Sequence, residues 1–223
     1  NTAQLKLIKM GVEKTIKPSL LVYKVLLAGI MRQRKLAGVF CMNDAKSCYG
    51  RIVHAPAALC MRRQGVPALV CEVLLGTLQQ SVHNIQTGYG IAPSVYQSSN
   101  GGPPLQGAGQ GNGAGPAMWA IISTVIIHAM KRAGHGVQVL SALSTMAVCI
   151  VCFAFVDDAD TIETAHSVDQ SGEEVLQQFQ PAVDRWEGLL RATGGAIEPS
   201  KSWWVLIDFV WDAPSHEFKY RSI

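Results

Sequence analysis

Two adjacent carboxylates, Asp157 and Asp158, directly follow the apolar, β-rich run Cys149–Val156. Such a run is typical of a strand that passes through a core. Acidic side chains at the end of a buried strand cost free energy unless a cation meets them. A divalent metal bound by oxygen ligands at a site for phosphate chemistry is the usual answer. The pair therefore indicates a metal site, and nearby Asp160 is expected to be solvated.

A third carboxylate, Asp44, follows another apolar run, residues 37–42, that we expect to be a buried strand. Two strand ends can bring Asp44, Asp157 and Asp158 to one point. Three clustered acids would raise each other's pKa, so they require metal. Two Mg²⁺ ions bridged by carboxylates are the standard apparatus for in-line displacement at phosphorus. Taken alone, Asp44 is better explained as a residue that caps the turn after its strand.

A glycine-rich loop, residues 107–115, precedes a helix that we expect to begin at Pro116. Glycines leave backbone N–H groups exposed close to the start of this helix. That arrangement suits a base, a sugar or a phosphate lying on the loop. A flexible linker is the alternative, and Gln110 together with the helix start makes a bare linker the weaker explanation.

The remaining pattern predicts mixed helices and strands without regular alternation, which favours an α+β fold over a doubly wound sheet. A capping box at Ser171–Glu174 should start a long helix that Pro181 kinks or splits. The other expected elements are helices at 20–35, 52–64, 68–80 and 116–132, strands at 37–42, 82–89, 149–156 and 203–211, and a loop at 90–115.

Four segments occur in an informative order. They are Asp44-Ala45-Lys46-Ser47-Cys48-Tyr49, Gly107-x-x-Gln110-Gly111-x-x-x-Gly115-Pro116, Phe155-Val156-Asp157-Asp158, and the segment Gly194-Gly195 to Lys201. These segments resemble motifs A, B, C and D of reverse transcriptases, and the resemblance covers roughly residues 20 to 211. The nearest type is an RNA-directed DNA polymerase of a retroelement.

The resemblance implies the palm of a right-hand polymerase, in which helices back an antiparallel sheet. It implies partial fingers or a connecting helix at residues 1–36, a palm at 37–211 and a C-terminal tail at 212–223. We expect no thumb and expect the chain to be a piece of a longer protein.

The resemblance also implies roles for individual residues. Asp44, Asp157 and Asp158 match the carboxylates that bind two Mg²⁺ ions, for which Mn²⁺ can substitute. Lys201 matches a lysine that can donate a proton to leaving pyrophosphate, and is counted with the three acids as catalytic.

Residues implied to bind substrate are Ala45, Tyr49, Gln110 and Gly111. The ring of Tyr49 would collide with a ribose 2′-hydroxyl and so select deoxynucleotides. The implied partners are a dNTP and an RNA template carrying a DNA primer. Two positions depart from the family pattern: Gly50 stands where many relatives carry an acid, and Gly115 where serine is usual. A decayed palm that at most binds nucleic acid is therefore an alternative function.

Composition sets the remaining limits. Hydrophobic residues make up 48% and charged residues 16%, which excludes a disordered tail, and the net charge of +3 does not by itself argue for nucleic-acid binding. The six cysteines lie mostly in apolar runs, so we expect a reduced protein inside the cell. The uncharged runs Ala117–Met130 and Val137–Val156 raise the alternative of a small membrane protein with two spans. Since the second run contains polar residues and includes most of the expected strand before the acids, we expect no membrane partner.

Overall fold

The computed structural model describes residues 18–98, 102–109, 111–141, 143–155 and 158–221. The chain forms two compact units. The first comprises Asn1–Asp44, Ala129–Trp186 and Glu198–Ile223, and the second comprises Ala45–His128 and Glu187–Ile197. The division into fingers, palm and tail at residues 36 and 211 stays a prediction.

A four-stranded antiparallel sheet forms the centre of the first unit. Its strands lie in the order β6 (Cys152–Phe155), β7 (Asp158–Thr164), β1 (Gly38–Asp44) and β8 (Trp203–Ile207). β1 is hydrogen-bonded to a strand on each side and is buried along most of its length, and this burial explains its apolar sequence. The predicted strand before Asp44 is thereby confirmed.

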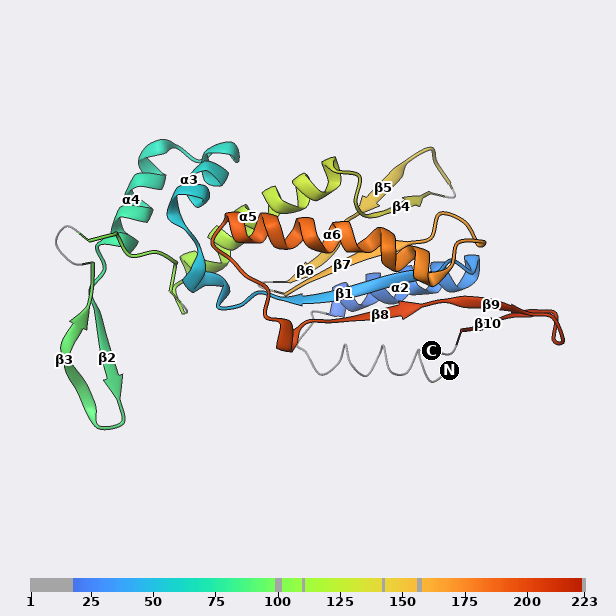
Figure 1. The fold of residues 1–223 in the computed structure, drawn as a ribbon. Coiled ribbons are helices and arrows are strands. Elements are labelled where there is room, and N and C mark those ends of the chain that lie inside the picture. Colours follow the sequence, from blue (N-terminus) through green and yellow to red (C-terminus); the bar gives the residue numbers. More distant parts are fainter. Residues whose placement is uncertain (1–17, 99–101, 110, 142, 156–157, 222–223) are drawn as a thin grey trace. The chain divides into compact units, whose positions relative to one another are not determined.

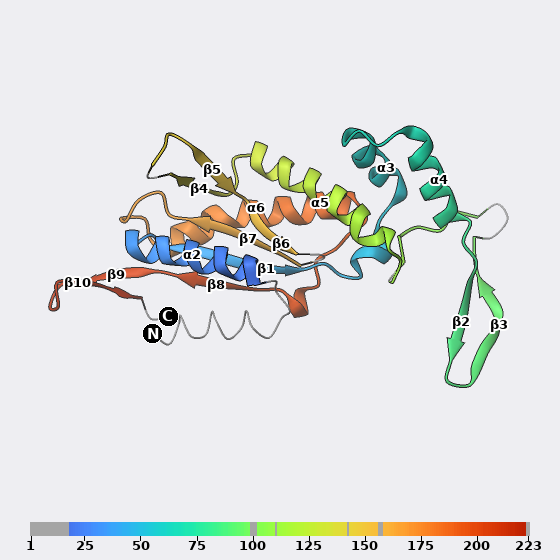
Figure 2. The ribbon, with the colours of Figure 1, turned by 180° about the vertical axis from the view of Figure 1, so that it is seen from behind.

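Helices lie on the two faces of this sheet. Figures 1 and 2, seen from opposite sides, show α2 (Pro18–Arg34) on one face and α6 (Gly172–Ala192) on the other. α6 buries Val175, Phe179 and Trp186 at helical spacing. The core on the α2 side consists of Leu27, Met31, Phe40, Val137, Phe153, Ile162 and Ile207.

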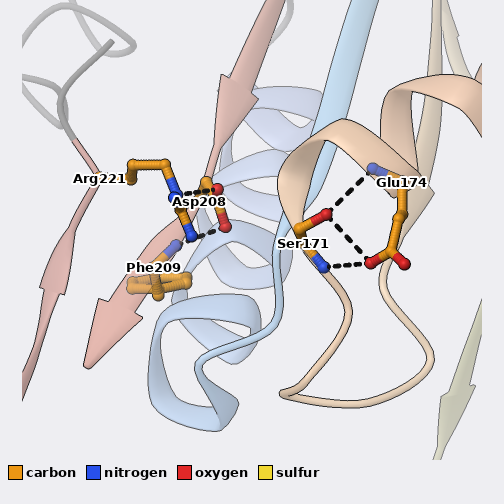
Figure 3. Close-up of polar contacts among 5 residues, drawn as sticks. All are labelled: Ser171, Glu174, Asp208, Phe209 and Arg221. Carbon is orange, nitrogen blue, oxygen red and sulfur yellow. Dashed lines mark hydrogen bonds and ion pairs between the residues drawn. The ribbon is translucent and has the colours of Figure 1, made fainter.

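The predicted capping box starts α6 (Figure 3). The Ser171 backbone N–H donates to Glu174 Oε2 at 2.7 Å, and the Glu174 N–H donates to Ser171 Oγ at 3.2 Å. These bonds satisfy amides at the helix start, and the hydrogen bonds from Ser171 lower the pKa of the Glu174 carboxyl. The predicted split at Pro181 is wrong, because the exposed proline lies inside one undivided helix whose apolar face is buried along its length.

Ser171→Ala is expected to lower the free energy of unfolding by about 1 kcal/mol, because the cap that satisfies the Glu174 N–H is lost. Urea unfolding followed by circular dichroism measures the change. Ser167→Ala, in the exposed segment before the helix, is the matched control and should leave the unfolding midpoint unchanged. Equal midpoints for the two variants would contradict a stabilising role for the cap.

Two hairpins complete the first unit: β4 (Val137–Leu140) with β5 (Ala147–Ile150), and β9 (Phe209–Asp212) with β10 (Glu217–Tyr220). The single strand predicted for 149–156 is wrong in its described part, since β5 pairs with β4 whereas β6 pairs with β7.

The strand predicted for 203–211 is likewise divided, between Ile207 and Phe209. Asp208 lies at the break, where Arg221 pairs with its carboxylate at 2.7 Å and donates its backbone N–H to the Asp208 carbonyl (Figure 3). The carboxylate also accepts the Phe209 N–H at 2.8 Å. Ladder bonds and these end contacts, rather than local sequence, set the strand boundaries.

The second unit contains the predicted helices α3 (His54–Arg63) and α4 (Ala68–Gln79), the short η1 helix (Cys48–Arg51) and a two-stranded sheet. That sheet pairs β2 (His83–Thr87) with β3 (Gly90–Tyr96). The loop predicted from Gly90 therefore begins later in the chain. Pairing with β2 supplies hydrogen bonds to β3, and a sequence rich in glycine and proline does not indicate such pairing.

α5 (Ala114–Arg132), which begins two residues before the expected Pro116, is the one helix in the described ranges that is long and apolar enough to cross a membrane. Met118, Ile122, Ile126 and Met130 form a buried stripe on it, as in a helix packed on a core. A second span over Val137–Val156 is wrong, because the described residues of that run form β4, β5 and β6.

Candidate active site

Asp44 and Asp158 lie directly opposite each other in the sheet of the first unit. Asp44 is the last residue of β1 and Asp158 the first of β7, and the two are register partners. Opposed residues of an antiparallel pair share one face, with Cβ atoms about 5 Å apart. The structure thus brings together two of the three predicted acids, both half-buried. Asp157 lies outside the described residues.

The two opposed carboxylates fit a hard divalent cation. Carboxylate oxygens are the ligands that Mg²⁺ prefers in proteins. Among the described residues, no group of three His, Cys, Asp or Glu side chains is arranged to hold a metal ion. The two-metal set that includes Asp157 remains a prediction.

A buried ion pair lies beside these acids. Asp160, two residues beyond Asp158 and on the same face of β7, pairs with Lys24 of α2. The expected solvation of Asp160 is wrong: it is 6% exposed, because β7 lies inside the sheet. Burial lowers the pKa of Lys24, and the negative charge of Asp158 opposes that shift. This contact joins residues 136 positions apart, and no local sequence pattern predicts it.

The turn at residues 198–202, which resembles part of motif D, holds the backbone of Asp44 on both sides. The Glu198 N–H donates to the Asp44 carbonyl at 2.8 Å, and the Asp44 N–H donates to Ser202 Oγ at 3.2 Å. Ser202 Oγ donates in turn to the Glu198 carbonyl at 2.9 Å. Lys201 belongs to this turn, in η2 (Pro199–Lys201), and is exposed. The structure therefore places the lysine-bearing turn against Asp44, while the proton-donor role of Lys201 stays a prediction.

The second unit joins the predicted gate, Tyr49, to the glycine loop. The Ala108 N–H donates to the Tyr49 carbonyl, and the Gly107 N–H donates to the Ile52 carbonyl, each at 2.8 Å. The expectation of exposed amides is therefore wrong for these two groups. Gly107 has φ of +83°, and a Cβ there would lie 2.6 Å from the Gly50 carbonyl oxygen, so glycine is required.

Gly115 lies against the gate residue. A Cβ at this position would lie 3.2 Å from Tyr49 Cγ, which is closer than ordinary van der Waals contact. A serine, as in the family pattern, would press on the ring in this arrangement. Gly111 is exposed with φ of +83°, and Gln110 lies outside the described residues.

Gly194, in the segment that resembles motif D, allows the backbone to pass close to Arg51 within the second unit. Gly194 has φ of +91°, and a Cβ there would overlap the carbonyl of Arg51. The Arg51 Nε–H donates to the Gly194 carbonyl at 3.1 Å, and Ala45 forms an antiparallel bridge with Ile197. The segment after Asp44 is thereby fixed to the segment that precedes Glu198. Ala45 is half-buried at this bridge, and its substrate contact stays a prediction.

No family model and no curated protein matches the sequence. Among solved structures, it is similar to telomerase from Candida tropicalis in complex with the TWJ fragment of telomeric RNA. The TM-score is 0.55 at 11% identity, over 91% of this chain and 32% of that one. It is also similar to apo telomerase from Candida tropicalis truncated from its C-terminal domain, with a TM-score of 0.55 at 12% identity, over 98% of this chain and 44% of that one.

The chain spans less than half of the length of either telomerase chain. At such low identity the likeness is one of fold. It confirms the predicted α+β class, with an antiparallel sheet backed by helices, a fold that the chain shares with these telomerase structures.

Proposed function

We propose that this chain, with its reverse-transcriptase-like fold, carries the catalytic centre of an RNA-directed DNA polymerase. The reaction is nucleotidyl transfer, in which a primer 3′-hydroxyl attacks the α-phosphate of a dNTP and pyrophosphate leaves. The observation that supports it best is the opposition of Asp44 and Asp158 on one face of the sheet, at the positions that motifs A and C predict.

Asp44, Asp157 and Asp158 would hold two Mg²⁺ ions, or Mn²⁺ in their place. Bound ions would lower the pKa of the primer hydroxyl and neutralise charge on the leaving pyrophosphate. The contribution of the protein is to hold oxygen ligands in place before substrate arrives. The Glu198–Ser202 turn does this for Asp44 through backbone hydrogen bonds, and ladder pairing does it for Asp158.

The proposed partners are an RNA template with a DNA primer, and a dNTP. Tyr49 would contact the sugar of the incoming nucleotide and exclude a 2′-hydroxyl. Contacts hold Tyr49 on two sides, because its ring packs against Gly115 and its backbone carbonyl accepts the Ala108 N–H. An RNA partner agrees with the similar telomerase, which is described in complex with a fragment of telomeric RNA.

The test is extension of a labelled DNA primer on an RNA template, with Mg²⁺, Mn²⁺ or EDTA. It should use this chain and a longer form that includes flanking sequence. We expect template-directed incorporation of dNTPs that depends on the divalent ion. A reaction without template is the control for terminal addition. Absence of incorporation by both forms, with folding verified, would overturn the proposal.

A decayed palm that binds nucleic acid without catalysis is the second candidate, favoured by Gly50. No described atom lies within 4 Å of the Cβ that a side chain at Gly50 would add. Packing therefore does not explain why the acid found in many relatives is missing here. Binding of an RNA–DNA duplex by both forms, without incorporation, would support this candidate.

A further inference from the structure

His54, the first residue of α3, is 2% exposed and makes contacts that converge on the glycine loop. Its Nε2 lies 2.9 Å from the Gly107 carbonyl oxygen, and its Nδ1 lies 3.1 Å from Gln79 Nε2. Its backbone N–H donates to Gln106 Oε1 at 2.8 Å. The sequence offered no role for His54, because no other residue stands at ligand spacing from it.

The neighbours of the ring determine its tautomer. The amide nitrogen of Gln79 can only donate, so Nδ1 of His54 must accept. The carbonyl of Gly107 can only accept, so Nε2 must carry the hydrogen and donate. A neutral imidazole satisfies both bonds at once, and its orientation is fixed by α4 on one side and by the loop on the other.

The peptide groups around Gly107 are held on both sides. The Gly107 N–H donates to the Ile52 carbonyl, and its own carbonyl accepts from His54. The next amide, that of Ala108, donates to the carbonyl of Tyr49. Two hydrogen bonds therefore connect the buried imidazole of His54, through the Gly107–Ala108 peptide group, to Tyr49, the residue proposed as the sugar gate.

We propose that His54 is a positioning residue that sets the selection of dNTP over rNTP by holding Gly107 and Ala108 in place against the backbone of Tyr49. This inference rests on the proposed function. Loss of the imidazole would release the Gly107 carbonyl and loosen the loop on which the gate depends. The ring then has less support against a bound ribose, and discrimination falls while the metal-binding carboxylates keep their positions.

Two variants remove the contacts separately. His54→Phe keeps a buried ring but removes both ring hydrogen bonds, whereas Gln79→Leu removes only the bond to Nδ1. His54→Gln is the conservative rescue, because its amide can still donate to the Gly107 carbonyl. Gln80→Leu is the matched control, an exposed neighbour of Gln79.

The first readout is hydrogen exchange of the amides of Gly107 and Ala108. We expect His54→Phe to speed their exchange about tenfold, in proportion to the loss of a buried hydrogen bond, with a smaller effect for Gln79→Leu. His54→Gln should restore most of the protection, and Gln80→Leu should match the wild type. Unchanged exchange in a folded His54→Phe protein would overturn the positioning role. If that variant does not fold, Gln79→Leu and His54→Gln decide the question.

The second readout is the ratio of kcat/KM for dNTP to that for rNTP. We expect His54→Phe to lower this ratio about tenfold and His54→Gln to restore it. Faster loop exchange with an unchanged ratio would overturn the role in selection. A wild-type chain that incorporates no nucleotide would instead overturn the proposed function and the selection claim with it, while exchange alone would still decide whether His54 positions the loop.

Discussion

Asp158→Asn is expected to slow Mg²⁺-dependent nucleotide addition by about a thousandfold. Asparagine keeps the size of the side chain and its place on β7 opposite Asp44, but it removes the negative charge that the metal ion requires. A loss of several kcal/mol of transition-state stabilisation corresponds to a rate change of about that size. Primer extension under single-turnover conditions measures it.

Asp44→Asn should have a similar effect, and the double variant should be little slower than either single one, because the two acids act as a unit. Asp169→Asn, an exposed acid before α6, is the matched control and should retain the wild-type rate. A second readout does not depend on activity. Mn²⁺ should raise the thermal stability of the wild-type chain and raise that of either variant less, because an ion that binds only the folded state stabilises that state. Retention of the wild-type rate by Asp158→Asn would refute the assignment of the acids.

Lys24→Met is expected to lower the free energy of unfolding by about 3 kcal/mol, because it leaves the carboxylate of Asp160 buried without its cation. The methionine fills much of the volume of the lysine stem, so the loss is mainly electrostatic. Denaturant unfolding measures it. Arg34→Met, at the exposed end of the same helix, is the control and should change stability by less than about 0.5 kcal/mol.

The cycle is completed by Asp160→Asn and by the double variant. If the pair is coupled, the double variant should be more stable than the sum of the two single losses predicts, since neither charge is then left alone. Additive losses would mean that Lys24 and Asp160 contribute independently, contrary to the ion pair.

β7 shows why part of the fold escaped prediction from sequence. Its seven residues, Asp158–Thr164, include three acids and two threonines, yet most of them are buried. Their burial is possible because partners come from elsewhere: Lys24 reaches Asp160, and the amide of Asn43 donates to Thr161 Oγ1 at 3.1 Å. Hydrophobic periodicity indicates the apolar faces of helices and strands. It does not indicate buried polar groups whose hydrogen-bond or ion-pair partners are distant in the sequence.

The candidate site divides in the same way. The residue types and their order predicted that Asp44 and Asp158 would meet at strand ends, and the register agrees. The sequence also predicts the glycine loop, but with open amides, whereas the amides of Gly107 and Ala108 donate to the carbonyls of Ile52 and Tyr49. Composition indicates where the backbone can bend sharply. Which carbonyl each amide meets, and that His54 completes the set, depends on tertiary contacts.

The hydrogen bonds between residues 198–202 and Asp44 also affect the order in which parts of the structure form during synthesis. The backbone N–H and carbonyl of Asp44 find their partners in residues that are synthesised more than 150 positions later. β1 likewise pairs with two strands that are synthesised later, β8 on one side and β7 on the other. Contacts of such long sequence separation form slowly, because a large loop must close before they repay its entropy. The end of the sheet that carries Asp44 and Asp158 is therefore completed late, and a growing chain stays unable to perform the proposed chemistry until residue 202 has been synthesised.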